Sequence, residues 1–101
     1  MVEFITGRID FPSRRDFLQH EDENVTFSNP IRDFVVILTG YELKFDREEH
    51  PLHLANIDVQ GTLVPPSTVE VECVLGWRDH SGFFNDDYTG YVAYAVIAET
   101  E

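Results

Sequence analysis

The chain has 101 residues, of which 43% are hydrophobic and 13% aromatic, and its formal net charge is −12 at pH 7. This length and apolar content support one globular domain with a single core and exclude a chain that is disordered throughout. Nineteen acidic residues against seven basic ones argue against nucleic-acid binding, and no apolar run approaches the roughly 18 residues of a membrane span.

The N-terminal segment and the single cysteine bear on the cellular compartment. Glu3 and Asp10 stand where a secretory signal would need a basic and then an apolar stretch, so we expect no signal peptide in this sequence. Cys73 cannot form an internal disulfide, and its place in an alternating segment predicts a buried structural thiol. These features fit the cytoplasm, and they also fit a secreted or particle-associated domain.

The first third of the chain predicts two strands separated by a loop. Val2–Phe11 is apolar around Gly7, which predicts a strand that is weakened or bulged at the glycine. Residues 12–23 are polar, begin with proline and lack a period, which predicts a loop. Asn24–Asn29 predicts a short strand that ends before a proline.

The middle of the chain predicts two longer strands. Phe34–Phe45 is the strongest strand pattern. Strict alternation places the following residues on one of its faces: Val35, Ile37, Thr39, Tyr41, Leu43 and Phe45. After the charged turn Asp46–Pro51, the apolar phase of Leu52–Leu63 shifts, which predicts a bulge near Leu54–Ala55.

The last third predicts two further strands after the rigid turn Val64–Ser67. Val69–Trp77 alternates cleanly between apolar and other residues, whereas Tyr91–Glu99 is apolar or aromatic on both faces. A sheet buries one face in its own core, so the second apolar face of Tyr91–Glu99 predicts contact with another chain. No helical period occurs, and residues 1–101 are expected to form a single six-stranded antiparallel β-sandwich.

Residues 78–90 form the longest predicted connection, and binding residues concentrate in such loops. Asp79, Asp86 and Asp87 supply the hard oxygen ligands that Ca²⁺ prefers, although their spacing does not match an EF-hand. The alternative interpretation is that these aspartates cap turns through their own backbone. A calcium site is therefore one of two hypotheses for this loop, and no other cofactor is expected.

Catalysis has little support in the sequence. There is no G-x-S-x-G elbow, no H-E-x-x-H motif and no phosphate-binding glycine loop. His50 and His53 lie three residues apart, which places them on opposite faces of a strand and argues against a shared zinc site. We therefore expect a protein that is not an enzyme, and a hydrolase ranks behind both binding and structural functions.

The ordered set of strand patterns resembles the H-type lectin family. The pieces that carry the resemblance are Gly7–Asp10, Asn24–Pro30, Phe34–Phe45, Leu52–Val59, Val69–Trp77 and Val92–Ala98. The chain also looks like a group of uncharacterised bacterial domains with an aspartate-histidine turn and an Arg-Asp-x-Ser-Gly loop, here Asp46–His50 and Arg78–Gly90. The resemblance implies a six-stranded sandwich that forms trimers or paired trimers and binds galactose or N-acetylgalactosamine.

The family's sugar site lies between neighbouring subunits, and the resemblance assigns four residues to it. An acidic residue before the second strand corresponds to Asp22, and an arginine early in the fourth strand corresponds to His53. The tryptophan and adjacent polar residue after the fifth strand correspond to Trp77 and Arg78. The chain departs from the family in His53, in Arg78 and in the family's disulfide, because Cys73 matches one partner while Phe11 occupies the other position.

Residue chemistry also supports sugar binding near Trp77. Aromatic faces pack against sugar C–H groups, and carboxylates or guanidinium groups bond sugar hydroxyls. Trp77, Arg78, Asp79 and Tyr88 provide these groups close together in the sequence. The competing interpretation of Trp77 is a strand-end residue of the core or of a subunit interface.

The sequence thus predicts a carbohydrate-binding homo-oligomer, a trimer formed through the strand that contains Tyr94 or a hexamer. The alternative is a structural module of a surface or phage-like particle, with the acidic loop stabilised by calcium.

Overall fold

The computed structural model describes residues 1–14, 18–45, 52–79 and 88–101 and contains six β-strands. The strands are β1 (Val2–Arg14), β2 (Leu18–Thr26), β3 (Ile31–Phe45), β4 (Leu52–Val64), β5 (Thr68–Asp79) and β6 (Tyr88–Thr100). No helix among the described residues has the length and apolar character needed to cross a membrane.

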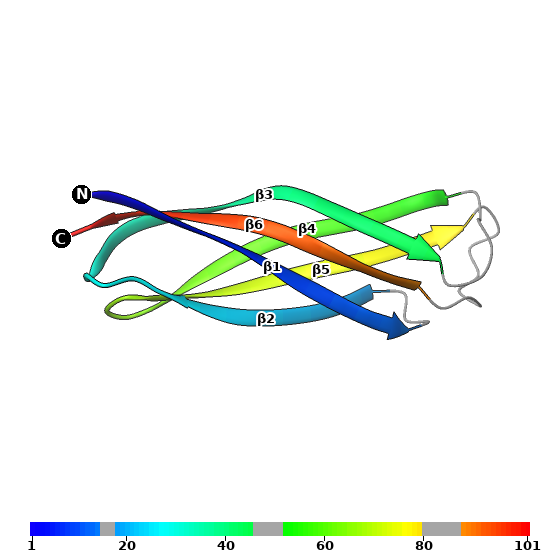
Figure 1. Ribbon diagram of the computed structural model, residues 1–101, viewed down its shortest axis with the longest axis horizontal. Coiled ribbons are helices and arrows are strands. Elements are labelled where there is room, and N and C mark those ends of the chain that lie inside the picture. The colour runs from blue at the N-terminus through cyan, green and yellow to red at the C-terminus, as the bar shows by residue number, and fades with distance from the viewer. Residues whose placement is uncertain (15–17, 46–51, 80–87) are drawn as a thin grey trace.

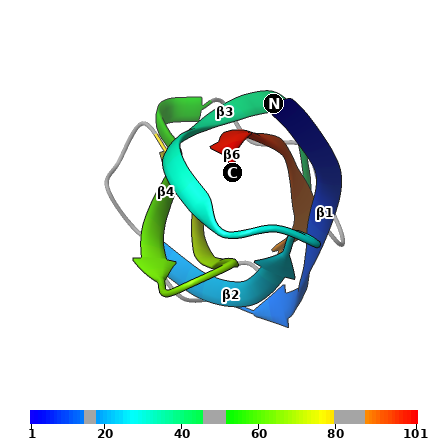
Figure 2. The same cartoon turned by 90° about the vertical axis from the view of Figure 1, so that its left-hand side faces the viewer.

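The strands form two antiparallel three-stranded sheets, which we call sheet A and sheet B. Sheet A has the order β1-β6-β3 and sheet B the order β2-β5-β4. The end-on view shows the two sheets packed face to face around one interior (Figure 2). The predicted all-β class with six antiparallel strands is confirmed, and the arrangement is that of a sandwich.

The core lies between the two central strands. Val69, Val71, Cys73 and Leu75 of β5 have no exposed surface, as the alternation of Val69–Trp77 predicted. They face the equally buried residues of β6, which are Tyr88, Val92, Tyr94, Val96 and Ala98. A central strand is covered by a strand on each side and by the other sheet in front, so it carries the most completely buried side chains.

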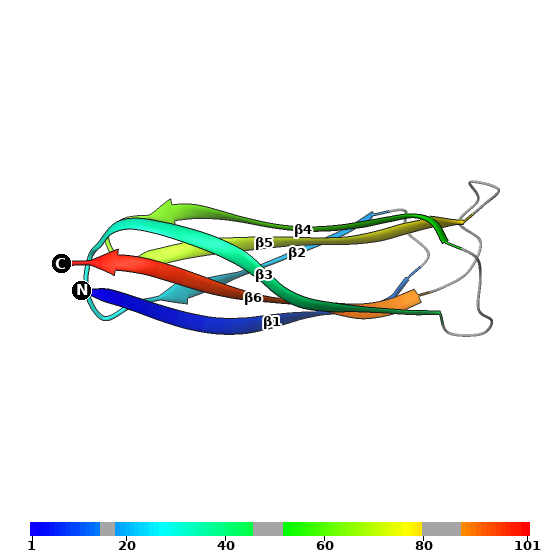
Figure 3. The same ribbon diagram turned by 90° about the horizontal axis from the view of Figure 1, so that it is seen from above.

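The molecule is long and narrow, with extents of 50 × 17 × 16 Å. Both termini lie at one end, where the backbone amide of Thr100 donates to the carbonyl of Met1 over 2.7 Å (Figure 1). At the other end β1, β3 and β5 finish, and β2, β4 and β6 begin (Figure 3). The candidate site residues of β4 and β5 therefore lie at the end far from the termini.

The prediction that residues 12–23 form a loop is wrong over most of its length. β1 continues to Arg14, and β2 begins at Leu18 and pairs with β5 through Thr26. The segment is polar because β2 is an edge strand with one face in solvent, and polar residues at an edge hide the apolar alternation. Tyr88–Gly90 and Arg78–Asp79 likewise belong to strands, so the predicted loop 78–90 is shorter than expected.

Gly7 does not form the predicted bulge. It pairs with Tyr94 in an uninterrupted register, and the shift in β1 lies between Phe11 and Arg14. The space that a side chain would occupy at residue 7 is filled by the ring of Tyr94. The glycine is therefore needed for the close approach of an aromatic ring.

Bulges in β3 and β4 determine which residues face the core. The register of β4 shifts between Leu52 and Leu54, which confirms the predicted bulge to within a residue. A second shift, between Leu38 and Gly40 of β3, was not predicted. It invalidates the assignment of alternate residues from Val35 to Phe45 to one face, because each extra residue reverses the alternation. The two faces of β3 therefore exchange at its midpoint.

Candidate functional site

Four of the predicted sugar-site residues lie together in the backbone register at the end of β4 and β5. Trp77 pairs with Ala55, and Arg78 and Asp79 pair with Leu54 and Leu52. His53 is the additional residue of the β4 bulge, between the positions opposite Asp79 and Arg78. The backbones of paired strands are about 4.8 Å apart, so the bulge brings His53 beside the Trp77–Asp79 segment.

Bulges often occur beside functional sites, because they redirect a side chain without breaking the sheet. An imidazole, an indole, a guanidinium and a carboxylate can together stack on a sugar ring and hydrogen-bond its hydroxyls. The chemistry of this set therefore fits reversible binding of a polar, ring-shaped ligand.

Asp22 lies apart from this set within one chain. It is exposed on β2 and pairs with Glu72, five residues before Trp77 along β5, which corresponds to roughly 17 Å at the usual rise of a strand. His20, Glu21, Asp22 and Glu72 line a shallow hollow of about 100 Å³. Asp22 can therefore join the β4–β5 set only if it comes from another copy of the chain, as the resemblance implies.

Tyr88 has a different role from the one predicted. It is the first residue of β6 and has no exposed surface, and its hydroxyl donates to the carbonyl of Leu75 over 3.3 Å. A ring without exposed surface cannot stack on a sugar. The prediction of a sugar contact at Tyr88 is therefore corrected to a core position that joins β6 to β5.

The predicted calcium ligands lie largely outside the described residues. Asp86 and Asp87 are outside them, and Asp79 is the last residue of β5. Within the described ranges no group of three His, Cys, Asp or Glu residues could hold a metal ion. The calcium hypothesis therefore stays a prediction that rests on the sequence.

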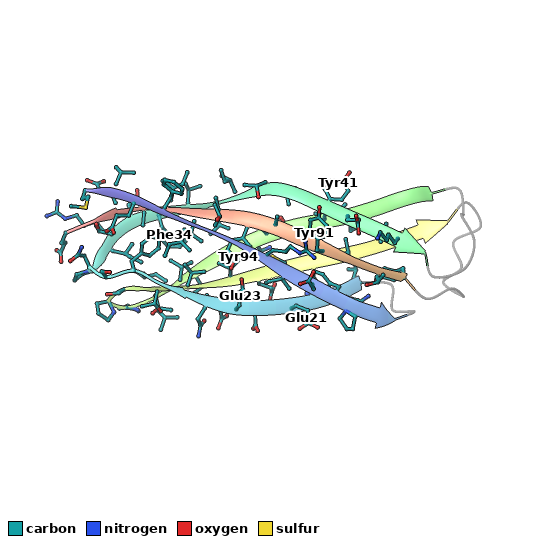
Figure 4. All side chains as sticks on the ribbon, in the orientation of Figure 1. Glu21, Glu23, Phe34, Tyr41, Tyr91 and Tyr94 are labelled. Atoms are coloured by element: carbon teal, nitrogen blue, oxygen red, sulfur yellow. The ribbon has the colours of Figure 1, made fainter. Side chains whose placement is uncertain are left out.

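The sequence patterns did not reveal two polar residues of β2, the buried Gln19 and the exposed Glu23, which contacts a core tyrosine. Gln19 is 2% exposed, and neither its amide nitrogen nor its amide oxygen has a hydrogen-bond partner. The carboxylate of Glu23 accepts a hydrogen bond from the buried hydroxyl of Tyr94, so the β2 edge is joined to the middle of β6 (Figure 4). Burial, together with this bond, raises the pKa of Tyr94. The sequence could have indicated their position, because residues 19 and 23 are an even number of residues from Val25 and therefore lie on the same face of the strand.

Cys73 is the buried thiol that the sequence predicted, with no exposed surface. Burial, with a smaller contribution from Glu23, raises its pKa from 9.0 to about 11. Cysteine reacts as the thiolate, so a buried thiol with a raised pKa is chemically inert. Cys73 is therefore part of the core and not of a reactive site.

Native Cys73 is expected to resist a thiol reagent at pH 8 and to react only on unfolding. Its contribution to stability should be complete below pH 9 and decline as the pH rises to about 11, because the unfolded chain releases the thiol proton first. Urea unfolding of the wild type and of Cys73→Ala is compared between pH 9 and about 11. Because both proteins contain Tyr94, the difference between their unfolding free energies reports the titration of Cys73. A difference in unfolding free energy that does not change with pH would contradict this assignment.

Comparison of the chain with descriptions of protein families, with curated proteins and with solved structures finds no match. The resemblance to H-type lectins therefore rests on the sequence patterns alone.

Proposed function

We propose that this chain is a non-catalytic, lectin-like carbohydrate-binding domain that acts as a homo-oligomer. Its sugar site comprises His53, Trp77, Arg78 and Asp79 at the end far from the termini, and Asp22 joins it from a neighbouring copy. By resemblance, the ligand is a galactose-type or N-acetylgalactosamine-type sugar. Repeated copies of one weak site give avidity toward a surface that carries many glycans.

The observation that carries this proposal is the β4–β5 register. Sequence alone places His53 more than twenty residues from Trp77, whereas the ladder makes it a neighbour of Arg78 and Asp79. Residues that the resemblance takes from two distant segments of the chain thus meet at one strand end. Such convergence of aromatic and polar residues on rigid strands is typical of a binding site.

A glycan array probed with the 101-residue chain tests the proposal. The wild type is expected to bind galactose-type glycans, and Asp79→Asn is expected to weaken that binding at least tenfold, since a lost charged hydrogen bond costs about 1.5–3 kcal/mol. Asp58→Asn is the matched control, because Asp58 is an exposed aspartate in the middle of β4 and outside the site. Asp58→Asn should bind like the wild type.

The array is run with calcium and with a chelator, so that it also tests Asp79, Asp86 and Asp87 as calcium ligands. The melting temperature is measured under the same two conditions. If glycan binding or the melting temperature depends on calcium, the loop binds a cation. If neither changes when a chelator is added, the calcium hypothesis is contradicted. A wild-type chain that binds no glycan under either condition removes the lectin function.

A second candidate function is a structural or assembly module of a surface or phage-like particle. The observation that favours it is the outer face of sheet A, where Phe4 is 72% exposed and Val35 is 50% exposed. Large apolar side chains that adjoin on a sheet face are typical of contacts between proteins. This function needs self-association but no sugar, so the glycan array separates the two candidates.

A further inference from the structure

The outer face of sheet A is apolar in its middle. The register aligns residues of β1, β6 and β3 into rows that cross this face. The two central rows are Phe4–Ile97–Val35 and Thr6–Ala95–Ile37. Ile37 is 42% exposed, less than Phe4 and Val35 in the row beside it. Apart from Thr6 on β1, these rows form an apolar band that the described part of the chain does not cover.

The outer face of sheet B has the opposite character. Most of its outward positions on β2, β5 and β4 are polar or acidic, and they include Asp22, Asp58, Glu70 and Glu72. None of the described side chains of this face belongs to a lysine or an arginine. In a chain of net charge −12, two such faces repel each other, whereas sheet A carries both signs of charge.

The two ends of the apolar band differ in charge, because the end away from the termini carries bases as well as acids and the other end carries an acidic pair. Arg8 follows the apolar rows on the side away from the termini, where it bonds Asp10 over 2.7 Å and lies 4.1 Å from the ring centre of Tyr91, a residue labelled in Figure 4. Asp33 and Glu99 stand directly opposite each other on the other side of the rows. A basic group and an acidic pair thus flank the apolar band at its two ends.

The acidic pair of Asp33 and Glu99 is unfavourable in a single chain. Like charges directly opposite each other on a sheet destabilise it, and neither carboxylate forms an ion pair within the described part of the chain. Both border a hollow of about 180 Å³ that Val2, Val35 and Ile97 also line. Apolar walls beside two carboxylates suit an arginine, whose stem is aliphatic and whose head is cationic.

We propose that two copies of this chain pair through the outer faces of their sheets A, with their strands antiparallel across the contact. Antiparallel packing lays the apolar bands on each other and places Arg8 of each copy over the Asp33–Glu99 end of the other. A twofold contact is self-complementary, so one face supplies both the base and its acidic partner. Arg8 has further donors beyond the two that it directs at Asp10.

This pairing deepens the self-association part of the proposed function and does not depend on sugar binding. It predicts an assembly with an even number of chains, either a dimer or two trimers joined face to face.

Light scattering on the purified wild type and on two matched valine variants tests the face. The wild type should contain an even number of chains, and Val35→Asp should halve its mass. Val64→Asp is the control, because Val64 is 46% exposed against 50% for Val35 but lies on an edge of sheet B. If the wild type is a monomer or a trimer, the chains do not pair. If the wild type contains an even number of chains but Val35→Asp leaves its mass unchanged, the chains pair through a surface other than the outer face of sheet A.

A charge exchange tests the orientation. Arg8→Glu should weaken pairing at least tenfold, and so should the double variant Asp33→Lys with Glu99→Lys, since each places like charges across the contact. Mixing the two variants should restore the wild-type mass, because both ends of the mixed pair then join opposite charges. If the mixture regains the wild-type mass, misfolding is excluded as the reason why each variant alone fails to pair. A mixture whose mass stays halved, with both variants folded by circular dichroism, overturns the antiparallel arrangement.

Discussion

Replacing Gly90 with alanine is expected to destabilise the fold by about 2–3 kcal/mol, which is the usual cost of overpacking a core. Gly90 lies in the central strand β6, and a methyl group there would collide with the backbone carbonyl of Glu42 on β3. It would also lie 2.9 Å from Cδ2 of Leu75. Backbone in a paired strand cannot easily move aside, so the pairing of β3 with β6 must be distorted locally.

Thermal and urea unfolding at a fixed protein concentration measure the effect of Gly90→Ala. A fixed concentration is needed because self-association contributes to apparent stability. Gly40→Ala on β3 is the matched control, since nothing lies within 4 Å of a methyl group at that position. It should be neutral or should stabilise by about 0.4–1 kcal/mol through the unfolded state. Equal stability of the two variants would contradict the packing described for Gly90.

The second large effect is expected at Gly7, where alanine should cost about 2 kcal/mol by overpacking. The new methyl group would collide with the ring and hydroxyl of Tyr94, whose Cε2 would lie 3.0 Å away. Tyr94 is 1% exposed and its hydroxyl is bonded to Glu23, so the ring has no free position to adopt.

A double-mutant cycle isolates the Gly7–Tyr94 contact. In a Tyr94→Leu background, Gly7→Ala should cost at least about 1 kcal/mol less than in the wild type, because the shorter side chain leaves room. In a Tyr94→Phe background the cost should persist, since the ring remains although the bond to Glu23 is lost. Costs that are equal in all three backgrounds would show that the defect at Gly7 has another origin.

The candidate site was predicted unevenly. Residue chemistry and resemblance selected His53, Trp77, Arg78 and Asp79, and the β4–β5 ladder brings their backbones together. Tyr88 was selected for the same chemistry, yet it is buried. Sequence patterns give residue types but not exposure at a strand end, because exposure depends on where the opposite sheet ends.

The sequence by itself determined the strands whose apolar side chains alternate. Val69–Trp77 lies within β5, and its odd-numbered residues up to Leu75 are fully buried, because burial of one sheet face imposes a period of two. The β4 bulge was predictable for the same reason, since its apolar phase had to shift to remain in one core. Cys73 followed directly from the alternation of β5.

Only the tertiary structure decided the features that depend on a neighbouring strand. The extra residue near Leu38 reverses the faces of β3, and Gly7 makes room for a ring that is distant in the sequence. The first part of β2, residues 18–23, was predicted as loop because polar residues at a sheet edge hide the alternation, whereas the predicted strand Asn24–Asn29 overlaps its end. The alignment of Phe4, Ile97 and Val35 across three strands likewise depends on pairing. Local periodicity records which side of a strand is buried, whereas pairing and register arise from contacts between distant segments, which no local pattern encodes.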